Sequence, residues 1–219
     1  MRIRAPRELA ALPYAHRLVA FDEEFARDGD HESEHFADRV IDDVEGGGSV
    51  FTECAFSGVT FSGGRLRRAR FDDVWMHGVR VVGTDFVESA WMDVECVAGM
   101  WAGMEIFGAG MRRVTFHNCK FDSVNLRSAT LREVAFSECL LRDVDFGGAS
   151  LTDVVFSGTT LERVRFENAK LYKVDLRGAA ALGISAGLES MRGATIDTGQ
   201  LMELAPGLAH VVGLTVKDR

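Results

Sequence analysis

An apolar or aromatic residue occupies every fifth position from Phe51 to Leu176, without exception over 26 consecutive positions. An α-helix repeats near every 3.6 residues and a flat β-strand at every second residue, so a period of five fits neither element. A chain that points one side chain inward in every five residues must turn a corner after each unit. The period therefore predicts a solenoid, whose coils stack around a core filled by these residues. The positions are Phe51, Phe56, Phe61, Leu66, Phe71, Met76, Val81, Phe86, Trp91, Cys96, Trp101, Ile106, Met111, Phe116, Phe121, Leu126, Leu131, Phe136, Leu141, Phe146, Leu151, Phe156, Leu161, Phe166, Leu171 and Leu176.

A second set of smaller inward residues lies two positions before each of these central residues. From Ala109 to Val174, valine alternates at this position with alanine, cysteine or threonine, which superimposes a period of ten. Like residues stack in columns only if each coil holds an even number of units, and two units leave no room for a core. We therefore expect four units, or 20 residues, in each coil. Valine–phenylalanine columns should then occupy one pair of opposite sides.

The units themselves resemble a known family. Ala129–Glu133 reads ATLRE, Val144–Gly148 reads VDFGG and Val174–Gly178 reads VDLRG. This pattern is similar to that of the pentapeptide repeat family, whose units run Ala, Asp or Asn, Leu and two variable residues, and the resemblance covers at least 130 of the 219 residues. It implies an all-β fold, a right-handed, four-sided parallel β-helix solenoid. Its coils should stack at roughly 4.8 Å, the spacing of hydrogen-bonded strands.

The pattern divides the chain into three parts. Residues 1–48 have no sustained period and are expected to form an acidic N-terminal cap over the first coil, because an open β-helix end exposes unpaired backbone groups. The stretch from Arg7 to Phe25 is open to helix or to disorder. Phe36 and Ile41 continue the period weakly, which leaves open one irregular coil before the β-helix of residues 49–181. Residues 182–219 form a C-terminal cap.

The C-terminal cap carries a predicted helix. Asp197 or Thr198 can begin it, Pro206 should kink or split it, and Gly213 suits its end. Residues 214–216 are expected to form a short strand. The segment resembles the C-terminal part of gyrase-protecting members of the family, which implies a homodimer. The alternative is that the apolar stripe only covers its own last coil. The candidate dimer interface consists of Leu201, Leu204, Leu208, Val211, Val212, Leu214 and Val216.

Charge and cysteine content limit the choice of partners. The net charge is −8, and its excess lies chiefly between Asp22 and Glu45, whereas residues 49–178 hold 17 acidic and 16 basic side chains. No apolar run reaches 18 residues and the N-terminus lacks the apolar stretch of a signal peptide, so we expect a cytoplasmic protein without a membrane partner. Cys119 and Cys139 lie 20 residues apart and should stack. A disulfide or metal pair stays open, although buried free thiols fit the alanine positions they replace.

A solenoid with a filled core offers no concave interior for catalysis, and we expect neither an enzyme nor a cofactor or metal site. His77 and His117 share a column but lie two coils apart, too far to share a metal ion. The acidic loop around His31 and His35 is more typical of a solvated surface. Direct nucleic-acid binding is not expected, because the coils lack net positive charge.

Three functions remain, of which the third is a purely structural or self-assembling role. Resemblance to the quinolone-resistance members, and above all to loop-free gyrase inhibitors, implies a DNA mimic that binds DNA gyrase or another topoisomerase and modulates it or protects it from quinolone-type poisons. The alternative is a protein–protein interaction scaffold with an unrelated partner, which the acidic stretch favours. The candidate mimic surface is a column on one side of the coils, interrupted by Arg113 and diluted by other basic residues on that side. Its carboxylates are Glu53, Asp73, Asp93, Glu133 and Asp153.

Overall fold

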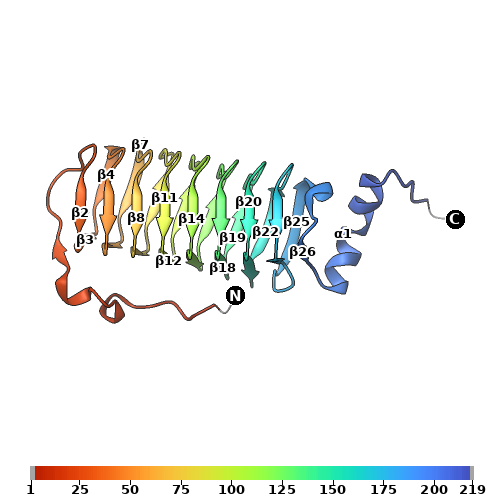
Figure 1. Ribbon diagram of the computed structural model, residues 1–219, viewed down its shortest axis with the longest axis horizontal. Helices are drawn as coiled ribbons and strands as arrows, with labels where there is room; N and C mark the ends of the chain where they lie inside the picture. Colours follow the sequence, from red (N-terminus) through yellow and green to blue (C-terminus); the bar gives the residue numbers. More distant parts are fainter. Residues whose placement is uncertain (1–2, 218–219) are drawn as a thin grey trace.

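The computed structural model describes residues 3–217 as a rod of stacked coils with one helix at its C-terminal end (Figure 1). Every strand pairing is parallel, and from Asp30 up to the last coil paired residues in neighbouring coils are 20 apart, as in Phe36↔Phe56 and Val81↔Trp101. Four five-residue units therefore make one coil, as the alternating pattern predicts. The rod is a four-sided parallel β-solenoid of about eight coils.

Three sides of the rod are continuous sheets, named A, B and C, and the fourth is narrower. Sheet A consists of β1 (Val19–Ala20), β3 (Glu34–Ala37), β6 (Ala55–Ser57), β9 (Trp75–His77), β12 (Glu95–Val97), β15 (Thr115–His117), β18 (Ala135–Ser137), β21 (Val155–Ser157), β24 (Val174–Asp175) and β26 (Ala194–Thr195). Sheet B consists of β2 (Asp30–Glu32), β5 (Val50–Thr52), β8 (Arg70–Asp72), β11 (Ala90–Met92), β14 (Gly110–Arg112), β17 (Thr130–Arg132), β20 (Ser150–Thr152) and β23 (Lys170–Tyr172). Sheet C consists of β4 (Val40–Glu45), β7 (Thr60–Arg65), β10 (Arg80–Val82), β13 (Met100–Ala102), β16 (Lys120–Asp122), β19 (Leu140–Arg142), β22 (Thr160–Arg165) and β25 (Ala181–Ala186). Single β-bridges such as Arg65↔Asp85 connect the coils along the fourth side.

The central residues fill the interior in columns. On sheet A, the rings of Phe116, Phe136 and Phe156 stack with centroids 5.1 Å apart. On the opposite, fourth side, Phe146 and Phe166 stack at 5.2 Å. The expected placement of phenylalanine columns on opposite sides is therefore confirmed, and the buried core runs the length of the rod. No helix in the described part of the chain is long and apolar enough to cross a membrane.

The first coil begins at Asp30, within the segment expected to be a cap. Its inward positions are atypical, because His31 stands where other coils carry apolar residues and Gly46 has no side chain, so the period is hard to recognise there. The ring of His31 stacks on Phe51 with centroids 4.8 Å apart. Phe21 and Phe25 then cover the open end of the core and contact Phe36. The cap proper is thus a short segment that leads into an acidic first coil.

Residues 3–18, called the strap below, run back along the outside of the rod (Figure 1). The strap contains two 3₁₀ turns, η1 (Leu9–Ala11) and η2 (Ala15–Arg17), and is otherwise irregular or extended. The next residues, β1, pair with β3 at the edge of sheet A. The strap therefore starts near the middle of the rod and reaches its N-terminal end, an arrangement that the sequence pattern does not indicate.

The C-terminal segment closes the other end. Strands β25 and β26 extend sheets C and A, with η3 (Leu188–Ser190) between them, and α1 spans Thr198–Val211. Asp197 caps α1 by accepting a hydrogen bond from the backbone N–H of Gln200, whose side chain bonds back to the N-cap. Of the two residues expected to begin the helix, Asp197 is the N-cap, and Gly213, with a φ of 76°, lies just after the helix end as expected.

Of the two effects expected of Pro206, splitting is wrong, because the helix continues through it, while a kink stays a prediction. The carbonyl of Met202 loses its helical donor there, but Met202 is exposed, so water can satisfy it. The expected strand after the helix is also wrong. Residues 214–216 form no strand, because no neighbouring strand edge lies beside them and their side chains are exposed.

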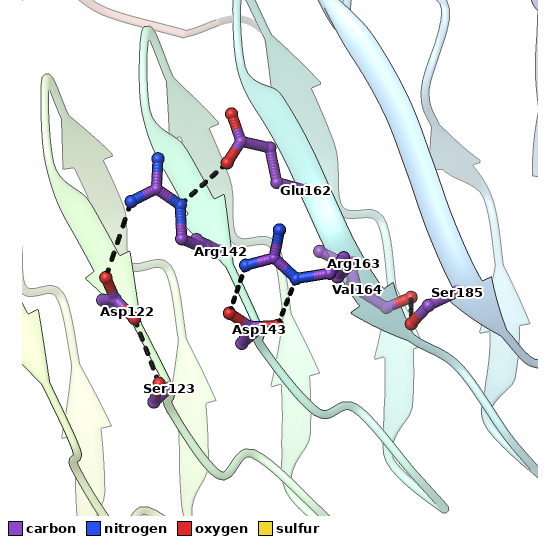
Figure 2. A network of polar contacts seen from close by, with 8 residues as sticks. All are labelled: Asp122, Ser123, Arg142, Asp143, Glu162, Arg163, Val164 and Ser185. Carbon is purple, nitrogen blue, oxygen red and sulfur yellow. Dashed lines mark hydrogen bonds and ion pairs between the residues drawn. The ribbon is translucent and has the colours of Figure 1, made fainter.

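Ion pairs connect neighbouring coils at one corner of sheet C (Figure 2). Arg142 contacts Glu162 in the next coil at 2.8 Å and Asp122 in the previous coil at 3.8 Å. Arg163 donates two hydrogen bonds to Asp143. The partners are 20 residues apart in each case, so the coil length that stacks the core also brings opposite charges together on the surface.

Candidate interaction surfaces

The predicted carboxylate column forms at the corner between sheets B and A. Its seven stacked positions, including Arg113 and Lys173, all have φ between 52° and 57°. This left-handed backbone turns the chain from one sheet to the next. The side chains therefore project at one edge of the rod, coil after coil, and the structure brings all five predicted carboxylates into one line.

Basic side chains neutralise much of this column. Arg113 donates hydrogen bonds to both oxygens of Asp93, with its Nε 2.6 Å from Oδ1. Arg17 of the strap pairs with Glu53, and Arg132 lies 3.7 Å from Glu133. Partial burial and the nearby Asp93 carboxylate raise the pKa of Asp73 above its usual value. As a continuous row of free negative charges, the column is weaker than the sequence suggests.

Arg7 fastens the start of the strap to sheet A. The Oε1 atom of Glu95 accepts the backbone N–H of Arg7 at 2.6 Å, and its Oε2 atom accepts the Nε–H of the same residue at 2.6 Å. The indole Nε1–H of Trp75 donates to the Arg7 carbonyl oxygen at 3.2 Å. The Glu95 side chain is only 8% exposed. Charge-assisted bonds of this kind, shielded from water, are stronger than those on an open surface.

Apolar contacts hold the rest of the strap. Leu12 and Tyr14 are buried against Ala55 and Trp75, which point outward from sheet A. Burial raises the pKa of the Tyr14 phenol well above its usual value, and its hydroxyl donates to the carbonyl of Cys54 at 3.4 Å. The strap therefore makes a small second core on the outside of the solenoid.

A polar cavity of about 540 Å³ lies where the start of the strap passes over the corner of sheets A and B. Arg4 and Arg7 of the strap line one side, and Asp73, Glu95 and His117 are among the residues that line the other. Burial lowers the pKa of His117, which favours the neutral imidazole. The cavity lies between the strap and the outer surface of the rod, and the interior of the coils is filled.

The strongest charge feature is the N-terminal end of the rod. Residues 22–45, which form the first coil and its cap, contain 11 acidic and 2 basic side chains, a net charge of −9. Of the acidic residues only Glu34 is partly buried, and the other ten are exposed. The remaining 195 residues therefore carry a net charge of +1, because the whole chain carries −8.

The predicted dimer residues fall into two groups, one packed against the last coil and one exposed. Leu204 is buried and Leu208 half-buried against the last coil of their own chain, as the alternative interpretation expects. Leu201, Val211, Val212, Leu214 and Val216 are exposed. Met202, which is not among the predicted interface residues, is 70% exposed on the same helix. An apolar surface therefore remains at the C-terminal end after the last coil has been covered.

All four cysteines are buried and free. Burial raises the pKa of Cys54 to about 12, and it also raises the pKa of Cys96. These thiols behave as small core residues, and Cys119 and Cys139 are not linked. Within residues 3–217, no three His, Cys, Asp or Glu side chains are grouped so as to hold a metal ion.

Known proteins match the chain through its repeats. A family model of nine-copy pentapeptide repeats matches residues 47–90, and a model of the pentapeptide repeat region matches residues 109–185. No curated protein matches the sequence. The two models together cover more than half of the 219 residues.

Solved structures with similar coils include QnrB1, HetL and Rfr23. Full-length QnrB1, a plasmid-mediated fluoroquinolone resistance protein, is 15% identical, with 82% of this chain and 99% of QnrB1 covered and a TM-score of 0.36. HetL, involved in heterocyst differentiation regulation in the cyanobacterium Nostoc, is 16% identical, with 79% and 91% covered and a TM-score of 0.26. Rfr23 from the cyanobacterium Cyanothece is 20% identical, with 42% and 64% covered and a TM-score of 0.25. The assignment therefore depends on the family models and on the repeat itself: the chain belongs to the pentapeptide repeat family.

Proposed function

We propose that the protein is a non-catalytic rod that binds a basic, nucleic-acid-binding surface of another protein through its acidic end. The observation that carries the proposal is the net charge of −9 over residues 22–45, with ten exposed carboxylates on one coil and its cap. The interior is filled by apolar side chains along its length, so the rod can bind a partner only through its outer surface.

The charge density of this end is comparable with that of DNA. One coil and its cap occupy about two strand spacings, or roughly 10 Å along the rod. Nine net charges over that length amount to about one per 1 Å, whereas duplex DNA carries one per roughly 1.7 Å. A protein surface built to bind phosphates would therefore attract this end, and the attraction should weaken as salt screens it.

A type II topoisomerase such as DNA gyrase is the specific partner that we propose to test first. The carboxylate column favours it, because its acidic groups repeat at the coil spacing along one edge and continue from the acidic end. Arg113 and Arg17 weaken this edge, so we assign the main contact to the first coil and a secondary contact to Asp73 and Asp153. Within the described residues, neither of these two carboxylates forms an ion pair.

We also propose that the rod forms a homodimer through the exposed apolar side chains of α1 and the residues after it. Val212, Leu214 and Val216 are 65–76% exposed, and such a patch is costly in a monomer. A dimer joined there would carry an acidic end at each extremity.

Two variants with equal charge change separate the acidic end from general electrostatics. The first replaces Glu23, Glu24 and Glu32 by glutamine. The matched control replaces exposed carboxylates of later coils that lie outside the proposed contact, as Glu88→Gln, Glu138→Gln and Glu189→Gln. We expect the wild type and the control to inhibit gyrase supercoiling, or to protect gyrase from a quinolone, at micromolar protein. The acidic-end variant should lose the effect at least tenfold. If the wild type has no effect on gyrase, gyrase is rejected as the partner. If all three forms pull down the same DNA-binding proteins, the acidic end is rejected as the binding site.

A further inference from the structure

Side chains of sheet A bind Arg7 through three of its polar groups. Its backbone N–H and its guanidinium Nε–H both bond to Glu95, while its carbonyl oxygen accepts from Trp75. Three groups of a single residue are thus read by two side chains from neighbouring coils. Loss of any one contact would leave a polar group of the sheet without its partner.

The surroundings make this recognition specific. The outward positions of β6, β9, β12 and β15 are mostly small, apolar or neutral, and Glu95 is the sole carboxylate among them. Within the described residues, Arg7 alone forms an ion pair with Glu95. A shielded carboxylate that accepts both a backbone N–H and an Nε–H, beside an indole N–H that donates to the carbonyl of the same residue, therefore fits an arginine in an extended segment.

We propose that the outer face of sheet A over β6, β9 and β12 is a binding groove for an extended, arginine-bearing segment of a partner protein, and that the strap occupies this groove as an internal ligand. The strap shows the chemistry that fits: an arginine at Glu95 and Trp75, followed after several residues by the apolar pair Leu12 and Tyr14 over Ala55. The inference is independent of the proposed role of the acidic end.

A tethered ligand competes strongly with one in solution. A short flexible tether gives an effective concentration in the millimolar range. A segment of equal intrinsic affinity would therefore be excluded from the wild type at micromolar concentration and admitted once the strap is weakened.

The test uses the full chain and a fluorescent synthetic peptide with the sequence of residues 3–18. The double variant Arg7→Ala/Tyr14→Ala removes the arginine contacts and the buried phenol of the strap. We expect it to bind the peptide at least tenfold more tightly than the wild type. Addition of Glu95→Gln should weaken that binding at least tenfold, as should Arg7→Ala within the peptide. Glu8→Ala is the control within the strap, since Glu8 is exposed and forms no ion pair among the described residues, and it should bind as the wild type does. Equal binding by the double variant and the wild type, or no effect of Glu95→Gln, would overturn the proposal.

A second measurement covers the case in which the double variant does not fold. Hydrogen exchange of the wild-type strap is followed with and without 5 mM unlabelled peptide. Displacement predicts exchange at least threefold faster in residues 3–18 and unchanged exchange in the coils. Unchanged exchange in the strap would contradict a groove that can accept another segment.

Discussion

Gly99 and Trp101 offer a direct test of how the core is packed. Gly99 occupies a small inward position that carries Val79 in the previous coil and Cys119 in the next. Its backbone is not left-handed, so alanine is not excluded by conformation. A Cβ atom added there would lie 2.9 Å from Nε1 of Trp101 and 3.3 Å from its Cε2. The indole is only 1% exposed and cannot move away without disturbing its neighbours.

We expect Gly99→Ala to destabilise the protein by about 1–3 kcal/mol, the usual cost of overpacking. Trp101→Leu removes the obstacle and introduces the residue that Leu141 and Leu161 provide in later coils. In that background Gly99→Ala should be close to neutral, so the two changes should couple by a similar 1–3 kcal/mol. Urea unfolding followed by far-UV circular dichroism gives the free energy of unfolding of the wild type, the two single variants and the double variant. This signal comes from the backbone and does not depend on tryptophan fluorescence. An equal cost of Gly99→Ala in both backgrounds, or no cost in the wild type, would refute the packing argument.

Three further predictions concern the core, the strap and the C-terminal end. Phe136→Ala, in the middle of the sheet A ring stack, should cost about 3–5 kcal/mol in urea unfolding, and a smaller loss than 1 kcal/mol would contradict a tightly stacked column. Burial lowers the pKa of His117, so the unfolded chain takes up a proton first as the pH falls below 6.5 and folded stability decreases from there. His117→Gln should therefore lose less stability than the wild type between pH 7 and pH 5.5, and identical losses would be inconsistent with this. Val212→Asp/Val216→Asp should convert a dimer to a monomer in sedimentation at micromolar protein, whereas a monomeric wild type would reject the proposed dimer.

The regular part of the fold could be predicted from the sequence because the period of the apolar residues directly sets the length of each side of a coil. Each central residue, such as Phe136 or Leu141, lies where the five-residue spacing puts it, and the alternation of small residues gave the coil length. The carboxylate column followed from the same register. Its neutralisation could be foreseen in part, since Arg113 belongs to the column, but Arg17 comes from a segment outside the repeat.

The strap could not be predicted, because its contacts join residues 68 and 88 positions apart without any period. Two signals were available in the sequence. Trp75 is a large aromatic residue at an outward position of a column that carries Ala55 in the previous coil and Thr115 two coils further on, and Glu95, between Trp75 and Thr115, is the one carboxylate among these four residues. Residues of this kind on the outside of a solenoid indicate a covering segment. The first coil was hidden for the opposite reason, since His31 and Gly46 break an inward pattern that the backbone nevertheless follows.

The most direct test of the proposed function is the affinity of purified gyrase for the full chain, measured between 50 and 200 mM salt with duplex DNA as competitor. An acidic end that imitates DNA predicts binding that DNA displaces and that weakens steeply with salt. The Glu23, Glu24 and Glu32 variant should lose most of this binding, while the control with the same net charge keeps it. Binding that is insensitive to salt and to DNA, or that the two variants lose equally, would contradict the proposal.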